Sequence, residues 1–214
     1  MNELTKRIFT SILLICLLIS MFVYNYIFIV ILIIFGTIIW VELSNLFIKI
    51  FKNNYLKTLV SFLVLIYIFY ILWLSMISFQ SNDTKIILLY TILICIMSDI
   101  GGYLFGKIFK GKKLTKISPN KTISGLIGAF VFSLLLLIVL NFTIENLNLI
   151  KYLILTLAVS GTSQLGDILI SYIKRKAKVK NTSNILPGHG GLLDRVDGII
   201  FAIPIGLNLA ILLS

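Results

Sequence analysis

Charged residues are scarce in this sequence. Asp, Glu, Lys and Arg together make up 13% of its 214 residues, whereas about a quarter of an ordinary soluble domain is charged. Hydrophobic residues make up 59%, and the mean hydropathy is +1.07. These values exclude a soluble globular protein and predict an all-α, polytopic integral membrane protein.

Cysteine and histidine are also nearly absent. Cys16 and Cys95 lie far apart in apolar runs and there is a single histidine, so neither a disulfide framework nor a zinc ribbon is expected. The sequence contains no Gly-x-Ser-x-Gly motif, which argues against a serine hydrolase, and no Walker A loop. It also has no basic domain outside the apolar runs, so nucleic acid is not an expected partner.

Long apolar runs are what the chain does have. A membrane-spanning helix needs about 20 apolar residues, and seven segments approach or reach this length: 8–23, 26–48, 56–79, 86–106, 123–142, 152–173 and 198–213. We expect a single membrane domain over residues 1–214, with N-terminal spans in 1–80 and a second half at about 86–213. No signal-peptide cleavage site follows the first run, so we expect this span to be retained.

The basic residues predict the orientation of these spans. With seven spans, 17 of the 19 Lys and Arg residues lie on one side of the membrane, which leaves only Lys85 and Lys151 on the other. The positive-inside rule makes the basic side cytoplasmic, with the N-terminus inside and Ser214 outside. Two cytoplasmic loops hold most of this charge, and we expect them to attract anionic lipid headgroups and phosphates.

Two acidic residues are predicted inside spans. Asp99 and Asp167 each lie about two turns from a cytoplasmic helix end, roughly 9–12 Å deep at about 1.5 Å per residue. A carboxylate at such a depth usually faces a polar interior or a cavity. Glu42 lies in the cytoplasmic turns of its span, where we expect it to pair with a lysine such as Lys49.

Small and polar residues accompany both aspartates. Asp99 shares a helix face with Gly102, Tyr103 and Gly106. Around Asp167, a polar stripe recurs at three- and four-residue spacing: Ser160, Ser163, Gln164, Ser171 and Lys174. Helix–helix packing explains the serines and glycines, but packing does not need a charge, so the aspartates indicate a functional site.

Residues 186–198, LPGHGGLLDRVDG, combine the only histidine with two further aspartates. Asp194 and Asp197 are spaced to share a helix face, and the predicted topology places them at the same membrane face as Asp167. Carboxylates without cysteines suit Mg²⁺ better than Zn²⁺. Three roles stay open for His189: metal ligand, phosphate donor or support of the glycine-rich turn, with phosphate contact ranked first. Carboxylates, a metal and cations together are typical of phosphoryl or nucleotidyl transfer.

Several motifs then resemble one enzyme family. Residues 171–197 read SYIKRKAKVKNTSNILPGHGGLLDRVD, which is similar to the signature of phosphatidate cytidylyltransferases. The segments SDIGGYLFGKIFKGKK at 98–113, ISPNKTISG at 117–125 and SQLGD at 163–167 resemble further elements of that family. The chain departs from the family pattern at Asn181, where the family has Asp, and at Ser124, where it has Glu. We expect Asn181 to be an outer position that binds no metal.

The resemblance implies the reaction and the residues that perform it. CTP and phosphatidic acid would give CDP-diacylglycerol and pyrophosphate in a cytoplasm-facing cavity within the membrane, and the catalytic half would be about 86–213. It implies catalytic roles for Asp167, Asp194, Asp197, Lys174 and Arg175, with Mg²⁺ on the three aspartates. It implies substrate or phosphate contacts for Asp99, Tyr103, Ser118, Lys121, Thr122, Lys180, His189, Gly190, Gly191 and Arg195. The expected location is the bacterial cytoplasmic membrane.

Alternatives remain open at this point. A related CTP-dependent transferase or kinase could act on a polyprenyl or ether lipid. A cation or proton transporter would use Asp99 and Asp167 as a relay, although it would leave the C-terminal motif without a role. Because the sequence departs from the family pattern at Asn181 and Ser124, the protein could also be a member of the family without catalytic activity. A second, monovalent cation and a homodimer are further open possibilities.

Overall fold

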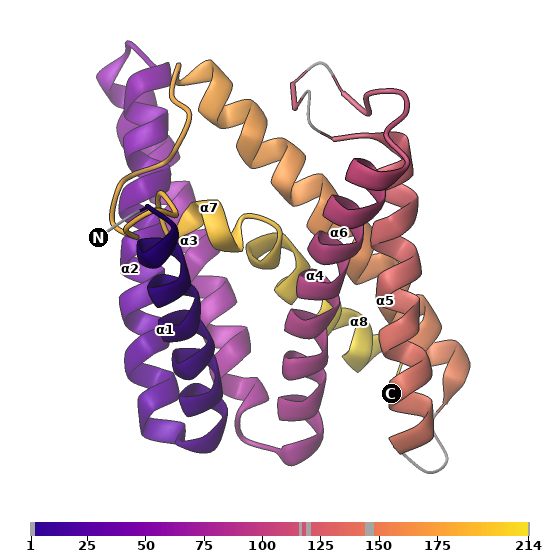
Figure 1. The fold of residues 1–214 in the computed structure, drawn as a ribbon. Coiled ribbons are helices and arrows are strands. Elements are labelled where there is room, and N and C mark those ends of the chain that lie inside the picture. The colour runs from indigo at the N-terminus through magenta and orange to yellow at the C-terminus, as the bar shows by residue number, and fades with distance from the viewer. Residues whose placement is uncertain (1–2, 116, 119–120, 144–147, 214) are drawn as a thin grey trace. The chain divides into compact units, whose positions relative to one another are not determined.

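The computed structural model describes residues 3–115, 117–118, 121–143 and 148–213. Apart from two isolated β-bridges, the regular structure in these ranges is helical (Figure 1). The helices are α1 (Glu3–Val23), α2 (Asn25–Ile50), α3 (Asn54–Ser78), α4 (Asn82–Ile108), α5 (Ile123–Thr143), α6 (Leu149–Lys176), α7 (Leu193–Val196) and α8 (Ile199–Leu212). Lys116, Pro119, Asn120 and Ser214 of the sequence predictions lie outside the described residues.

The all-helical membrane architecture predicted from the sequence is confirmed. Five of the described helices, α2 to α6, are long and apolar enough to cross a membrane, and two shorter apolar helices cover Ile8–Val23 and Ile199–Leu212. Each predicted span therefore contains a helix, while the count of seven crossings stays a prediction. A separate helix α7 was not predicted. Asp194 and Asp197 were expected to share one helix face at the start of the last span, but α7 ends at Val196, so it contains Asp194 and not Asp197.

The chain divides into two units. The first combines Met1–Phe79 with Ile173–Val196, and the second combines Gln80–Tyr172 with Asp197–Ser214. The expectation of a single membrane domain stays a prediction. In the first unit α2 packs against both α1 and α3 and also contacts α7. The rings of Phe28 and Phe79 stack with centroids 3.6 Å apart at one end of these helices.

The second unit has a mixed core of apolar and hydroxyl side chains. Its buried apolar cluster draws on α4, α6 and α8, and consists of Tyr90, Ile94, Cys95, Leu155, Val159, Ala202 and Ala210. Polar pairs join the same helices: Tyr90 Oη lies 2.7 Å from Thr156 Oγ1, and Ser98 Oγ lies 3.2 Å from Ser160 Oγ. Ser160 of the predicted polar stripe thus connects α6 with α4, which is the packing role expected for it.

Glycines allow α4 and α5 to approach closely. A Cβ at Gly101 would lie 2.7 Å from the Cβ of Phe132 and still closer to the carbonyl oxygen of Gly128. A Cβ at Gly128 would lie 2.5 Å from the carbonyl oxygen of Gly101. Because the obstacles are backbone atoms, a larger residue at either position requires the helices to separate. This crossing fixes the ends of α4 and α5 that carry the polar cavity described below.

We expect Gly101→Ala to lower the stability of the purified protein. The added methyl group overpacks the crossing, which typically costs about 1–3 kcal/mol. Gly161→Ala is the matched control, because a Cβ there would meet only the ring of Phe130 at 3.7 Å, an ordinary contact. The thermal midpoint in detergent should fall for Gly101→Ala and stay near the wild-type value for Gly161→Ala. Equal midpoints in the two variants would show that the crossing is not tight.

Candidate active site

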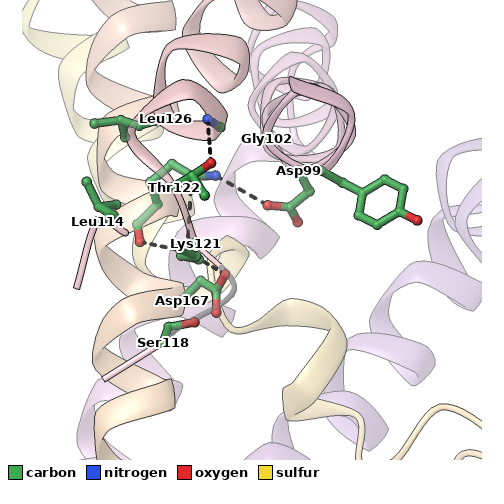
Figure 2. Close-up of a pocket in the computed structure, with 11 residues that line it drawn as sticks. Asp99, Gly102, Leu114, Ser118, Lys121, Thr122, Leu126 and Asp167 are labelled. Atoms are coloured by element: carbon green, nitrogen blue, oxygen red, sulfur yellow. Dashed lines mark hydrogen bonds and ion pairs between the residues drawn. The ribbon is translucent and has the colours of Figure 1, made fainter. Parts of the chain in front are cut away.

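A polar cavity of about 300 Å³ lies in the second unit. Figure 2 shows the side chains that line it, from α4, from the segment between α4 and α5, from the start of α5 and from α6. Six of the residues predicted from the sequence line this cavity: Asp99, Tyr103, Ser118, Lys121, Thr122 and Asp167. They come from parts of the chain up to about 70 residues apart, so the fold gathers residues that the motifs alone could not place together.

Lys121 is paired with Asp167 at the centre of the cavity. Its Nζ lies 2.5 Å from Asp167 Oδ2, the pair joined by a dashed line in Figure 2. Lys121 Nζ also lies 3.4 Å from the carbonyl oxygen of Gln164. On the other side of Asp167, Ser171 Oγ donates to Oδ1 at 3.4 Å. The ion pair therefore holds the lysine ammonium in place inside the cavity.

Asp99 is the second carboxylate of the cavity. Gln164 Nε2 lies 3.5 Å from Asp99 Oδ1 and donates to Ser98 Oγ at 3.0 Å. Two carboxylates and the single ammonium of Lys121 leave these three groups with a surplus of one negative charge. A surplus of carboxylate oxygens without cysteine or histidine suits a hard cation.

The loop before α5 positions Lys121 and Thr122. Its backbone is closed by Leu114 N donating to Lys121 O at 2.8 Å and by Ile123 N donating to Lys112 O at 3.0 Å. Thr122 then caps α5, because its Oγ1 accepts from Gly125 N at 3.1 Å, a standard N-cap contact. Thr122 thus has a structural role here in addition to lining the cavity.

A second polar pocket, of about 440 Å³, lies in the first unit on the glycine-rich motif. It is lined by Lys180, Asn181, Asn184, Leu186, Pro187, Gly188, His189, Gly190 and Arg195. The turn is closed by Leu186 N donating to Gly190 O at 2.8 Å. Gly188 and Gly190 have φ values of 78° and 88°, a region that residues with a Cβ rarely adopt. The pocket contains Lys180, His189 and Arg195 but no carboxylate, which makes it suited to an anion.

The side chains of this pocket are held by neighbours. Arg195 donates from Nε and Nη2 to the carbonyl oxygen of His189, at 3.2 and 2.7 Å. Thr10 of α1 makes a hydrogen bond between its Oγ1 and Nδ1 of His189, and Ser11 Oγ lies 3.5 Å from Nε2. His189 and Arg195, which were predicted to contact phosphate, therefore also stabilise the glycine-rich turn.

Asp194, at the start of α7, accepts hydrogen bonds from Lys174 and from two backbone N–H groups, and it lies beside the hydroxyl of Thr182. Lys174 Nζ donates to Oδ1 at 2.8 Å. Oδ2 accepts from the backbone N–H groups of Thr182 and Gly191, at 2.9 and 3.0 Å, and lies 3.1 Å from Thr182 Oγ1. Burial alone would raise the pKa of Asp194, but the hydrogen bonds from Lys174, Gly191 and Thr182 outweigh it and lower the pKa below its usual value. The carboxylate is thus stabilised in its charged form.

Glu42 of α2 is a member of this loop structure that sequence reasoning missed. The predicted pair with Lys49 is wrong, since Lys49 is exposed whereas Glu42 is only 2% exposed and binds the motif. Thr182 Oγ1 and Ser183 Oγ donate to it at 2.9 and 2.5 Å. The backbone N–H groups of Leu192 and Leu193 donate to it at 3.1 and 2.8 Å. A glutamate inside an apolar run was a signal of such a role, but its partners lie about 150 residues away.

The predicted Mg²⁺ ligands are distributed over the two units. Asp167 and Asp197 belong to the second unit and Asp194 to the first. Among the described residues there is no group of three or more His, Cys, Asp or Glu side chains arranged to hold a metal ion. The three-aspartate site therefore stays a prediction. Arg175, predicted to be catalytic, is exposed in the last turn of α6.

Comparison with known proteins gives one consistent result. A model of the cytidylyltransferase family matches residues 2–212. A phosphatidate cytidylyltransferase of Staphylococcus haemolyticus (strain JCSC1435) is 43% identical over 127 residues, which cover 58% of this chain and 48% of that protein. The one of Staphylococcus aureus (strain COL) is 46% identical over 129 residues, 59% of this chain and 49% of that protein. The chain thus spans about half the length of the curated relatives it matches.

The lowered pKa of Asp194 predicts how stability depends on pH. A carboxyl group whose pKa is lower in the folded state stabilises the fold above its unfolded pKa of about 3.9, and this contribution is lost as the pH falls through the folded pKa. Asp194→Asn should therefore have a lower thermal midpoint than wild type at pH 7. The difference should shrink as the pH is lowered below about 4. A difference that stays constant from pH 7 to pH 3 would contradict the stabilised carboxylate.

Proposed function

The chain belongs to the cytidylyltransferase family, and we propose that it transfers the cytidylyl group of CTP to phosphatidic acid. The products would be CDP-diacylglycerol and pyrophosphate. The observation that carries the proposal is the cavity in which Asp99, Lys121 and Asp167 meet, since it joins carboxylates and a cation from three separate motifs. The phosphatidate cytidylyltransferases that match part of the chain support the same substrates.

The proposed reaction needs neutralisation of the phosphate charges more than it needs a catalytic base. An oxygen of the phosphatidate phosphate attacks the α-phosphorus of CTP, a bond forms between them, and the bond from this phosphorus to the bridging oxygen of the β-phosphate breaks. The nucleophile is already anionic at pH 7, so no proton has to be removed. The obstacle is the repulsion between two polyanions, and positioned cations are the usual means by which proteins reduce it.

The lysines and arginines of the motifs supply part of this compensation. Lys121 and Lys174 are each held by an aspartate, at 2.5 and 2.8 Å, so each ammonium is already close to its place when the phosphates bind. We assign to Lys121, Lys174, Arg175 and Arg195 the neutralisation of the triphosphate and of the leaving pyrophosphate. Lys180 and His189 line the pocket suited to an anion and are assigned to phosphate contact.

Mg²⁺ suits the chemistry of the predicted donors, which are carboxylates. Asp167, Asp194 and Asp197 would hold it, because carboxylate oxygens are its preferred protein ligands. Bound there, it would neutralise phosphate charge during transfer. The chain's own residues would orient the two substrates and keep the ammonium groups in place.

The location of the reaction follows from the apolar helices. We infer seven crossings with the motifs on the cytoplasmic side of a bacterial membrane, because nearly all basic residues lie in the loops of that side. The cavity would then be open to CTP from the cytosol, while phosphatidic acid reaches it without leaving its leaflet.

Replacing Asp167 or Asp194 should abolish activity without removing the protein from the membrane. Asp167→Asn and Asp194→Asn keep the side-chain shape and lose the charge, and losses of electrostatic stabilisation commonly cost about 10²- to 10³-fold in turnover. The assay measures CDP-diacylglycerol formed from labelled CTP and phosphatidic acid by purified protein over a range of Mg²⁺ concentrations. Lys178→Ala, an exposed residue that lines neither pocket, is the control and should stay near wild type.

Two results would count against the proposal. Wild-type protein that forms no liponucleotide from CTP and phosphatidic acid, but does so from a polyprenyl or ether lipid phosphate, would change the substrate. Near-native activity of Asp167→Asn and Asp194→Asn at saturating Mg²⁺ would remove the proposed metal ligands.

The orientation can be tested by labelling single cysteines in intact cells. With Cys16 and Cys95 replaced by alanine, Asn82→Cys should react with a membrane-impermeant thiol reagent, because it is the first residue of α4, on the predicted outer side. Asn184→Cys should react only after the cells are opened. The opposite pattern would reverse the orientation and place the motifs outside.

A further inference from the structure

We propose that Glu42 is the positioning residue for the loop that carries His189 and Asp194. Its effect on turnover rests on the function proposed above, whereas its effect on the loop can be measured without any activity. Glu42 belongs to α2, and the loop belongs to the C-terminal part of the same unit. The N-terminal helices would thus contribute directly to the site, although their sequence contains no motif.

Among the described residues, the side-chain hydrogen bonds to Glu42 all come from the loop. Oε1 accepts from Ser183 Oγ at 2.5 Å and from Leu192 N at 3.1 Å. Oε2 accepts from Thr182 Oγ1 at 2.9 Å and from Leu193 N at 2.8 Å. The two backbone groups stand at the start of α7, where N–H groups have no partner within the helix. Glu42 therefore satisfies donors that the loop could not satisfy by itself.

Two further residues connect Glu42 with Asp194. The hydroxyl of Thr182 lies 2.9 Å from Glu42 Oε2 and 3.1 Å from Asp194 Oδ2, so it stands between the two carboxylates. Gly191 lies against the same group: a Cβ there would be 2.6 and 2.8 Å from the two oxygens of Glu42. A side chain at the third glycine of GHGG would thus clash with the glutamate, and a shift of Glu42 must move the segment that holds Asp194.

Fold stability alone gives no reason for a glutamate at this position. An acidic residue in an apolar helix is costly in a membrane, and well-packed apolar residues often replace buried ionic groups without loss of stability. Glu42 is the only acidic residue of α2. A buried carboxylate whose donors all belong to one loop is explained by the need to fix that loop.

Glu42→Gln is the most informative substitution. Each carboxylate oxygen faces a backbone N–H, and backbone donors cannot turn into acceptors. A glutamine amide has only one oxygen, so in either orientation its NH₂ group would face a backbone N–H. The variant keeps the volume of the side chain but cannot keep both helix-start contacts.

Hydrogen exchange followed by mass spectrometry tests the loop directly. In Glu42→Gln, peptides that cover residues 182–195 should exchange at least tenfold faster than in wild type, while peptides from α3 should be unchanged. Ser44→Ala is the matched control: Ser44 is buried in the same helix and its hydroxyl has no hydrogen-bond partner among the described residues. This variant should match wild type in both regions.

Turnover gives the second measurement. A displacement of about 1 Å at reacting groups can cost about a hundredfold in rate, so kcat of Glu42→Gln should fall at least tenfold. KM for CTP should rise as well, because the displaced loop carries His189 and Arg195, which are assigned to phosphate contact. Lys49→Gln should leave kcat unchanged, which separates the loop role from a surface ion pair with Lys49.

Thr182→Val provides a version of the test that leaves α2 intact. It removes the hydroxyl between the two carboxylates and should produce the same faster exchange in 182–195, to a smaller extent. If Glu42→Gln yields no folded protein, this variant decides the question. Unchanged exchange in Thr182→Val would then overturn the proposal.

The outcomes separate this proposal from the proposed function. Unchanged exchange and kcat in Glu42→Gln would overturn the positioning role, and so would a uniform increase of exchange throughout the first unit, which would show a general loss of stability. If wild-type protein makes no CDP-diacylglycerol, the proposed function fails, and the exchange pattern alone decides whether Glu42 holds the loop.

Discussion

The requirement that buried and half-buried carboxylates be matched by hydrogen-bond donors governs the functional part of this structure. An unpaired charge in a membrane helix or a buried loop is expensive. Asp167 is matched by Lys121 and Asp194 by Lys174. Glu42 is matched by two hydroxyls and two backbone N–H groups. In each case the carboxylate and its donors belong to different segments of the chain. The charges therefore determine which segments must lie in contact.

The ion pairs of Lys121 with Asp167 and of Lys174 with Asp194 also position the two ammonium groups for contact with phosphates. A lysine on a flexible stem is a mobile charge, and the paired aspartate restricts it to one place. The cost is that each ammonium is partly neutralised before a substrate arrives. This cost is removed if each aspartate binds a divalent ion when the substrate is present. The phosphates can then replace the aspartate as the partner of the lysine.

The sequence predicted the helices well because apolar runs of about 20 residues have few alternatives in a membrane. The long motifs also identified Asp99, Lys121 and Asp167 before their contacts were known. The partners of Glu42 could not be predicted, because periodicity describes only the face of one helix, and Lys49 was the nearest opposite charge along the chain. That α7 is a separate helix of four residues was missed for a similar reason: these residues carry no apolar period and are ordered by donors and acceptors from distant segments.

The contact between Glu42 and the loop also has a consequence for biosynthesis. Glu42 and Leu192 are separated by 150 residues, and chains are made at about 5–20 residues per second. The glutamate is therefore synthesised roughly 8–30 seconds before its backbone partners exist. During this interval α2 has to keep a carboxylate hydrated at the membrane surface or shielded by the insertion machinery. The final packing of α2 against this loop is thus a late event, completed only after residues 182–193 have left the ribosome.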